Sequence, residues 1–387
     1  MERCSLSTSV PDGRRPDIPA LTSLRFFAAL WIVLFHIREV GLWRGGVRPY
    51  LATIQLGYLG VSFFFVLSGF ILVYVYSGRE LEKMRFWQAR FARIYPAYLL
   101  SLLITLPGVL FFLPQLRQMH IAGLVLAAFP LLLEAWFPRI LFYWNAVAWS
   151  LSAEAFFYLV FPFVFRRLER PGWRGLGLWI SAAWLASLAL TTTYVLLRPD
   201  GVAHTNTLDN QLFWLSVVKF NPLVRLPDFL LGMGVGMAFL RLPARARSWP
   251  IAAGIAFIVV AIVLQKQIPY PIMHSGLLAP AFALIVFGFA TQPVWTRFLA
   301  FKPMLLLGEA SYSLYLLHLF GIILLAFLFH LAGSPYIIEV VVLYLIGICV
   351  LSIGVFLFIE SPLRRLLRPR PRRDRTVETT TQASVSM

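Results

Sequence analysis

The stretch LRFFAALWIVLFHIREVG, residues 24–41, is almost continuously apolar. A helix needs roughly 20 mostly apolar residues to cross the hydrocarbon core of a bilayer, and runs of this kind recur along the chain. They do not alternate between polar and apolar residues, so they predict helices and not strands. Hydrophobic residues make up 59% of the chain and charged residues 13%, which excludes a soluble globular domain. The sequence therefore predicts an all-α, polytopic integral membrane helical bundle.

We expect about ten transmembrane helices plus one re-entrant or interfacial segment. The segment in question is residues 121–137, which is apolar but short and contains Pro130 and Glu134. If it does not cross, nearly all the clustered arginine falls on one side, as the positive-inside rule requires for cytoplasmic loops. The expected spans are 24–40, 57–76, 95–113, 146–166, 175–197, 223–241, 250–266, 276–291, 305–330 and 336–360.

Charge and composition at the ends of the chain predict its orientation. Residues 1–20 read as a disordered cytoplasmic leader, 21–365 as the transmembrane domain and 366–387 as a disordered basic cytoplasmic tail. Both termini are then cytoplasmic, in a membrane of the bacterial inner or plasma membrane type. The net charge of +17 is carried largely by loop arginines, which marks membrane orientation, so we expect no nucleic-acid partner.

Arg25 and His36 are eleven residues apart on the first predicted span. On a helix this spacing brings them to within about 20° of the same face and separates them by about 16 Å along the axis. Arg25 then lies at the cytoplasmic end, and His36 lies beyond the bilayer midplane, where an ionisable group is costly and usually has a function. The alternative is a neutral histidine that is hydrogen-bonded to a neighbouring helix.

Glu154, in the stretch WSLSAEAFFYLVFP, is predicted to lie at a depth that matches His36. Ser150, Glu154 and Tyr158 share one stripe at i, i+4 spacing. A carboxylate next to an imidazole would orient it as a general base. An interhelical polar contact without chemistry is the other interpretation.

Two further groups carry candidate site residues. Arg90 and Arg93 are neighbours on a helix surface at the cytoplasmic mouth and could bind phosphates, although positive-inside anchoring explains them equally well. Ser311, Tyr315 and His318 share one face, as a packing seam or as the lining of a polar lumen. The histidines outside these groups lack metal-ligand spacing, so no metal is expected.

Seven blocks together resemble the acyltransferase 3 family of integral membrane proteins, in the order typical of that family and over most of residues 17–365. The chain is most similar to members in which the membrane domain stands alone. One block would be weak evidence, but seven in order are specific. The blocks are IPALTSLRFFAALWIVLFH, GYLGVSFFFVLSGFIL, RFWQARFARIYPAYLL, WSLSAEAFFYLVFP, RLPDFLLGM, LGEASYSLYLLH and IESPLRR.

The resemblance implies acyl-CoA, usually acetyl-CoA, as a cytoplasmic donor and a hydroxyl acceptor at or beyond the outer side. The acceptor would belong to a cell-surface carbohydrate, glycolipid or related glycoconjugate such as a polysaccharide or lipopolysaccharide. His36 would be the catalytic residue, Arg25, Arg90 and Arg93 would bind the donor, and Glu154 matches the acidic position of its block. Trp149, Ser150 and Tyr315 are candidates to stabilise an oxyanion; with Tyr158, Ser311 and His318 they are the candidate residues of a substrate channel.

Two other functions fit the same residues. One is acylation of a cytoplasmic secondary metabolite, with the acceptor on the donor's side. The other is transport of an anionic solute, with the arginines as its binding site and His36 and Glu154 as a proton relay.

Overall fold

The computed structural model describes residues 15–42, 53–201, 212–243, 248–291, 297–332 and 338–369, and every regular element in these ranges is helical. The all-α prediction is thus confirmed. Most of the predicted leader and tail, residues 1–14 and 370–387, lie outside the described ranges. Within the described ranges, the ten longest helices are α1 (Pro19–Glu39), α3 (Gly60–Tyr76), α4 (Lys83–Phe111), α7 (Trp149–Leu168), α8 (Trp173–Leu197), α10 (Pro222–Arg241), α11 (Trp249–Val263), α13 (Ala279–Thr291), α15 (Lys302–Ala332) and α16 (Ile338–Val355).

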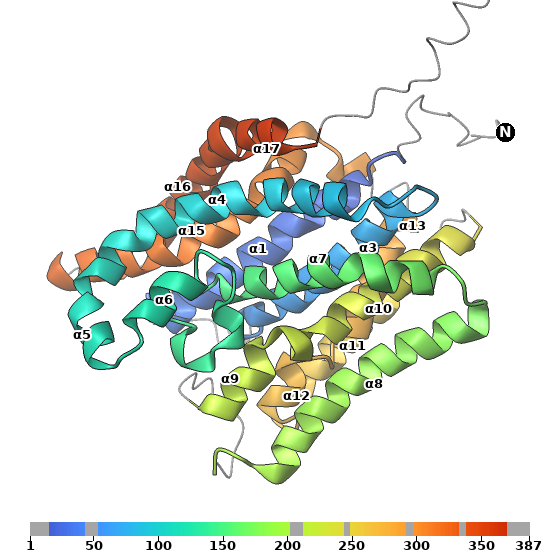
Figure 1. Cartoon of the computed structure of the whole chain (residues 1–387), viewed down its shortest axis with the longest axis horizontal. Helices are drawn as coiled ribbons and strands as arrows, with labels where there is room; N and C mark the ends of the chain where they lie inside the picture. Colours follow the sequence, from blue (N-terminus) through green and yellow to red (C-terminus); the bar gives the residue numbers. More distant parts are fainter. Residues whose placement is uncertain are drawn as a thin grey trace, which may run out of the picture.

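Short helices connect or extend these ten. In Figure 1, α8 lies at one edge of the bundle and α16 and α17 at the opposite edge, with α1, α3, α7 and α10 between them. The short elements are η1 (Gly57–Leu59), α5 (Leu113–Gln118), α6 (Ala122–Ala128), η2 (Glu134–Trp136), η3 (Pro138–Ile140), α9 (Phe213–Phe220), α12 (Tyr270–His274), the π-helix η4 (Phe356–Glu360) and α17 (Ser361–Leu367).

Each predicted span coincides with a helix or a pair of joined helices. Among the described residues, eight helical stretches are long and apolar enough to cross a membrane. The other two predicted spans correspond to α7, which has 20 residues but includes Glu154 and two arginines at its end, and to α11, which is apolar but has 15 residues. The chain is a polytopic helical membrane protein.

Helix directions agree with the prediction that residues 121–137 do not cross. Contacts between α3 and α10 pair Ser62 with Arg225 and Val66 with Gly232, so the two helices run in the same direction. If α4, α7 and α8 are the three crossings between them, α3 and α10 must be parallel; a fourth crossing at 121–137 would make them antiparallel.

The structure of residues 121–137 shows why this segment does not cross the bilayer. Its α6 has seven residues and its η2 has three, so neither is long enough to span a bilayer. Irregular backbone is tolerated at membrane depth only where protein satisfies its polar groups. Here the hydroxyls of Tyr98 and Tyr95, on α4, donate to the carbonyls of Phe129 and Pro130 at 2.6 and 3.1 Å.

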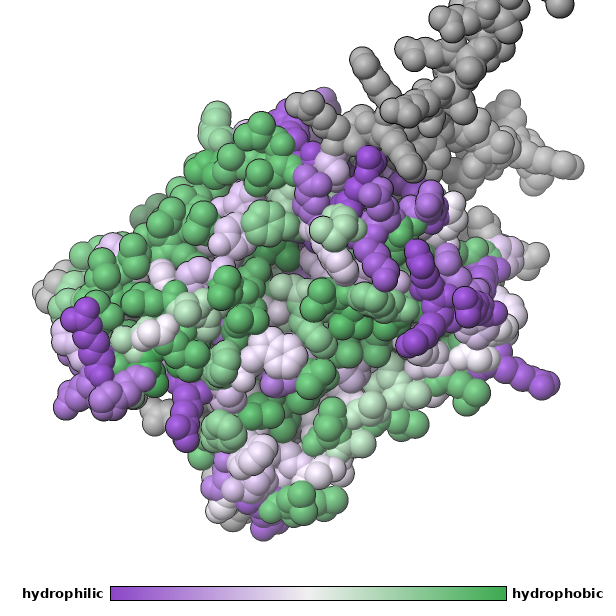
Figure 2. All heavy atoms as spheres, in the orientation of Figure 1, coloured by the Kyte–Doolittle hydropathy of each residue, from purple (hydrophilic) through white to green (hydrophobic). Residues whose placement is uncertain are grey.

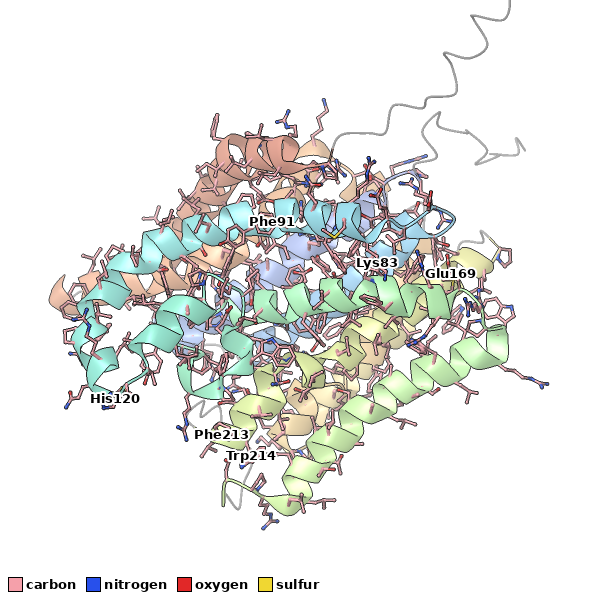
Figure 3. The ribbon with its side chains drawn as sticks, viewed as in Figure 1. Lys83, Phe91, His120, Glu169, Phe213 and Trp214 are labelled. Atoms are coloured by element: carbon pink, nitrogen blue, oxygen red, sulfur yellow. The ribbon has the colours of Figure 1, made fainter. Side chains whose placement is uncertain are left out.

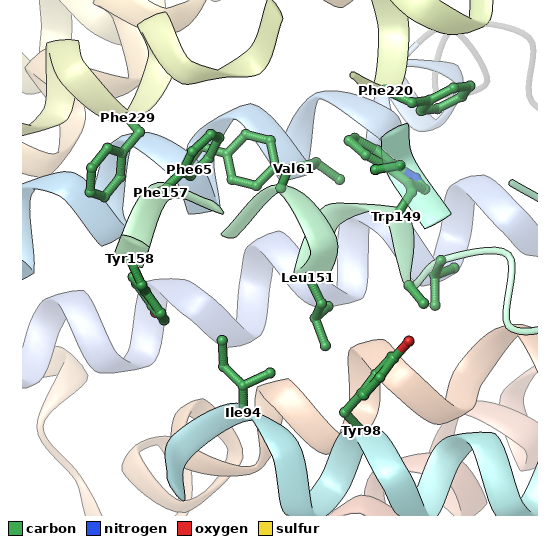
Figure 4. Close-up of a cluster of buried hydrophobic side chains, with 14 of the residues drawn as sticks. Val61, Phe65, Ile94, Tyr98, Trp149, Leu151, Phe157, Tyr158, Phe220 and Phe229 are labelled. Atoms are coloured by element: carbon green, nitrogen blue, oxygen red, sulfur yellow. The ribbon is translucent and has the colours of Figure 1, made fainter. Parts of the chain in front are cut away.

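Aromatic side chains hold α7 in the centre of the bundle. Phe157 packs against Phe65 of α3 and Phe229 of α10, with ring centroids 5.0 Å apart in both pairs. On the opposite side of α7, Tyr158 points toward Ile94 of α4 (Figure 4). Burial on both sides fixes the rotation of α7, and with it the direction in which its polar residues point.

The outer surface is predominantly apolar, as a lipid-facing surface must be. Phe358 is 80% exposed and Leu178 is 72% exposed. Figure 2 shows hydrophobic residues over much of the visible face and a concentration of hydrophilic residues at one end. Lys83 and Glu169 lie at that end, and His120 lies toward the other (Figure 3). We call these the Lys83 end and the His36 end, because α1 runs from the first to the second.

Glycine contacts fix α1 close to its neighbours at both ends. A Cβ on Gly308 of α15 would lie 2.2 Å from the Thr22 carbonyl oxygen, so α1 and α15 approach to backbone contact near the Lys83 end. A Cβ on Gly57 would lie 2.3 Å from the Trp31 carbonyl oxygen, near the His36 end. Only glycine permits such approaches.

Candidate active site

Helix α1 carries the first two predicted site residues. Apart from Pro19 at its start it contains no proline or glycine, so Arg25 and His36 are joined by unbroken helix. Both side chains are half-buried, and His36 lies three residues from the end of the helix. The structure keeps the predicted spacing of the pair along one helix face.

His36 meets a second histidine. Its Nδ1 lies 3.1 Å from Nε2 of His318 on α15, and 3.0 Å from the carbonyl oxygen of Ile32 one turn earlier in α1. His318 is fully buried, whereas His36 remains half-buried. Of the predicted stripe on α15, His318 is therefore the residue that reaches the candidate catalytic histidine.

The structure does not pair Glu154 with His36, and this part of the prediction is wrong. Glu154 accepts hydrogen bonds from the hydroxyls of Ser68, at 3.1 Å, and Tyr158, at 2.5 Å. It lies within electrostatic range of Arg25. The depth estimate failed because Ser150 lies at the level of Tyr315, so Glu154 is one helical turn closer to the Lys83 end.

Ser150 and Tyr315 link α7 to α15. Their hydroxyl oxygens are 2.7 Å apart, and the Tyr315 hydroxyl also donates to the Val147 carbonyl at 2.9 Å. Because His318 is three residues beyond Tyr315, this link lies next to the two histidines.

Two of the predicted channel residues, Trp149 and Ser311, make packing or intrahelical contacts and do not reach the two histidines. Trp149 packs against Phe65 and Phe220 in the aromatic core, with ring centroids 6.2 and 4.8 Å apart. The Ser311 hydroxyl donates to the Gly308 carbonyl within its own helix at 2.7 Å. Neither contact brings these side chains to His36.

The predicted arginines converge near the Lys83 end. Nη1 of Arg93 lies 3.6 Å from Oε1 of Glu360, whose other oxygen accepts from Ser313 at 2.9 Å. Arg25 lies within electrostatic range of both Arg93 and Glu360. Glu360 is the last residue of the π-helix η4, a distortion that often occurs at functional sites.

Arg90 lies on the same face of α4 as Arg93. Its guanidinium carbon is 5.7 Å from the ring centroid of Tyr158 and 5.8 Å from that of Phe86, so two rings stack near it. Its Nε is buried without a hydrogen-bond partner. An Arg90 held by rings keeps donors free for an anion, because ring stacking uses none of them.

The cluster at this end has an excess of positive charge. It contains the guanidinium groups of four arginines and two carboxylates, which leaves two positive charges uncompensated. Close arginines in a partly buried site favour a polyanionic ligand such as a phosphate. The members are Arg25, Arg90, Arg93, Arg364, Glu154 and Glu360.

A separate buried ion pair lies toward the His36 end. Nη2 of Arg225 is 2.9 Å from Oδ2 of Asp228, and both side chains are 1% exposed. Arg225 also donates to the Ser62 hydroxyl and, at 3.1 Å, to the His274 carbonyl. The pair joins α10 to α3 and α12, which is a structural role.

Sequence reasoning missed the residues that position the site. Ser68 and Ser313 hold the two carboxylates, and Glu360 pairs with Arg93 of a distant helix. Serines inside apolar runs and an acid at the end of a span were the available signals, because polar groups at such depth need partners. Among the described residues, no group of three or more His, Cys, Asp or Glu is placed to hold a metal ion.

A family whose description is "Acyltransferase domain" matches residues 18–360 of this chain. Acyltransferase MdmB of Streptomyces mycarofaciens is 30% identical over 319 residues, with 78% of each chain covered. O-acetyltransferase OatA of Staphylococcus aureus (strain NCTC 8325 / PS 47) is 28% identical over 379 residues, covering 90% of this chain and 57% of that protein. Peptidoglycan O-acetyltransferase OatA of Listeria monocytogenes serovar 1/2a is 25% identical over 340 residues, covering 79% and 49%.

The matches differ in how much of each relative they cover. The chain spans about half the length of the two OatA proteins and more than three quarters of MdmB. No solved structure matches.

Proposed function

The chain belongs to the acyltransferase family and is a membrane O-acyltransferase, and from this premise we propose that it moves an acyl group from acyl-CoA to a hydroxyl at the His36 end. The acyl group is acetyl and the acceptor is a cell-surface carbohydrate or glycolipid. The proposal is supported by the separation on α1 between a cationic cluster around Arg25 and a half-buried histidine.

In the proposed complex the donor's phosphates bind Arg25, Arg90 and Arg93. The excess positive charge of their cluster supports this assignment, as does the buried unpaired Nε of Arg90. Glu360 and Ser313 hold Arg93, and Glu154 lies near Arg25. The thin pantetheine arm then extends along α1 toward His36, about 16 Å away.

His36 acts as a general base in the proposed reaction. It takes the proton from the acceptor hydroxyl while the hydroxyl oxygen attacks the thioester carbonyl. The carbon–sulfur bond breaks and the new ester forms. The proton that His36 took from the hydroxyl then passes to the CoA thiolate. Tyr315, which lies beside the two histidines, is the proposed donor to the oxyanion; in the complex its hydroxyl proton would turn from the Val147 carbonyl to that oxygen.

A carbohydrate acceptor is supported by the relatives' names, since the Listeria relative is named for peptidoglycan O-acetylation. Mass spectrometry of cell-surface glycans with and without the gene tests this part. Loss of an O-acetyl group from one glycan supports it. Unchanged glycans, with acylated product released on the donor's side, would favour the cytoplasmic metabolite.

The orientation is also a proposal: the Lys83 end and both termini are cytoplasmic. The concentration of hydrophilic residues at that end supports it (Figure 2). Accessibility of single cysteines to an impermeant thiol reagent tests it. Labelling from outside the cell at residue 83, and not at residue 120, would contradict it.

The main experiment is acyl transfer by the purified protein in nanodiscs with labelled acetyl-CoA. Replacement of His36 by alanine should abolish transfer, and His120→Ala, which changes an exposed histidine, is the matched control. Arg25→Ala should raise the KM for acetyl-CoA. Near-normal transfer by His36→Ala would refute the role of His36, and transport without acyl transfer would favour the anion transporter.

A further inference from the structure

The hydrogen bonds of His318 determine which of its ring nitrogens carries the proton. Its Nδ1 lies 2.7 Å from the Tyr315 carbonyl oxygen and 3.2 Å from the Leu314 carbonyl oxygen. A carbonyl oxygen only accepts hydrogen bonds, so Nδ1 is the protonated nitrogen. In the neutral ring, Nε2 of His318 is then an acceptor.

The same reasoning applies to His36. Its Nδ1 faces two atoms, the Ile32 carbonyl oxygen at 3.0 Å and Nε2 of His318 at 3.1 Å. Both are acceptors, so Nδ1 of His36 donates and carries the proton. The lone pair of His36 is therefore on Nε2, the ring nitrogen that faces neither of these partners.

From this geometry we propose that His318 is a positioning residue for the acyl transfer. It holds the proton of His36 on Nδ1 and so presents Nε2 as the base. The inference rests on the proposed function, in which His36 removes the acceptor's proton. It also replaces Glu154, which Ser68 and Tyr158 hold elsewhere, as the group that orients the imidazole.

The contact between His318 and His36 also stabilises the charge that forms on His36 during the reaction. When Nε2 of His36 takes the hydroxyl proton, the ring becomes positively charged and its Nδ1–H bonds to Ile32 and His318 strengthen, because hydrogen bonds to a charged group are stronger. The proton on Nε2 then passes to the CoA thiolate. His318 stays neutral throughout, and it neither gains nor loses a proton.

The environment of His318 suits a fixed role. Its side chain is fully buried. The Tyr344 hydroxyl donates to its backbone carbonyl, and Tyr315 is itself tied to α7 through Ser150. A residue whose backbone carbonyl and ring nitrogen are both hydrogen-bonded can orient its neighbour.

The kinetic test compares two substitutions of His318. His318→Leu removes the acceptor and should lower kcat about 10- to 100-fold, the effect of one hydrogen bond to a group that becomes charged. The KM for acetyl-CoA should not change, because the arginines proposed to bind it lie near the Lys83 end, away from His318. His318→Gln places an amide oxygen where Nε2 lies and should restore kcat to within several-fold, which a merely structural loss would not show.

A spectroscopic test needs no substitution of His318. Solid-state NMR of the ¹⁵N-histidine-labelled protein, with the His36 signals assigned by their loss in His36→Ala, should show a protonated Nδ1 and an unprotonated Nε2. A protonated Nε2 on neutral His36 would overturn the inference. Provided that His36→Ala is inactive, two kinetic results would also overturn the inference: a normal kcat in His318→Leu, or a kcat in His318→Gln as low as in His318→Leu. Activity in His36→Ala would instead refute the proposed function.

Discussion

Replacing Gly308 with alanine tests how closely α1 must lie against α15. The added Cβ would lie 2.2 Å from the Thr22 carbonyl oxygen, and ordinary contact begins at 3.4 Å. The two helices must therefore move apart by about 1 Å along their contact. Overpacking of this kind costs about 1–3 kcal/mol, and the higher helix propensity of alanine offsets up to about 1 kcal/mol of it. We expect a net loss of about 1–2 kcal/mol in the free energy of unfolding.

Gly354→Ala is the matched control, because a Cβ on Gly354 has no atom within 4 Å. This substitution should stabilise the protein by up to about 1 kcal/mol. Denaturant unfolding of both variants in the same detergent measures the difference, which should be about 2–3 kcal/mol.

The substitution should also affect catalysis. Separation of α1 from α15 lengthens the 3.1 Å contact between His36 and His318, and a misplacement of 1 Å can cost about 100-fold in rate. We expect kcat for acyl transfer to fall in Gly308→Ala and to stay normal in Gly354→Ala. If the two variants unfold at the same denaturant concentration and turn over equally, the close contact does not constrain α1.

Three other substitutions test separate features. Asp228→Asn should cost about 3–5 kcal/mol, because it leaves the buried Arg225 unpaired, and adding Arg225→Met should recover part of this loss in the same unfolding assay. Burial raises the pKa of Glu134 well above 4.5 in the folded protein, so the folded state binds more protons and stability falls as pH rises above that value. Glu134→Gln should remove this decline in thermal unfolding above about pH 5; a decline that persists would assign it to another group. Glu360→Gln should raise the KM for acetyl-CoA severalfold without changing kcat, because it releases Arg93; an unchanged KM would separate Glu360 from the donor site.

The sequence predicts the helices well, because a helix that faces the hydrocarbon core of a bilayer must be apolar along its length. It places the start of α4 less well: the predicted span begins at residue 95, whereas the helix begins at Lys83. Hydropathy detects the apolar part of a helix, and the first three turns of α4 carry the charges that contact the site. Pro96, the second residue of the predicted span, lies inside this helix.

Positions along each helix can be predicted from the sequence, but the pairings between helices cannot. Arg25, Arg93 and His36 lie on the helices where the sequence places them, whereas the partners of Arg93 and His36 are Glu360 and His318. These contacts join residues more than 260 positions apart, and no periodicity in a single chain specifies which distant helices meet. The pairing of His36 with Glu154 failed for this reason, since the estimate used depth alone.

The glycine contacts of α1 hold this helix in a fixed position against its neighbours, so that it sets a fixed distance between two of its residues. Fixed near Thr22 by Gly308 and near Trp31 by Gly57, it keeps a constant distance of about 16 Å between Arg25, the proposed donor-binding cation, and His36, the proposed base. A donor is then measured by the distance from its phosphates to its thioester, independently of the acyl chain beyond. A thioester on a truncated arm would bind at the arginines and stop short of the base.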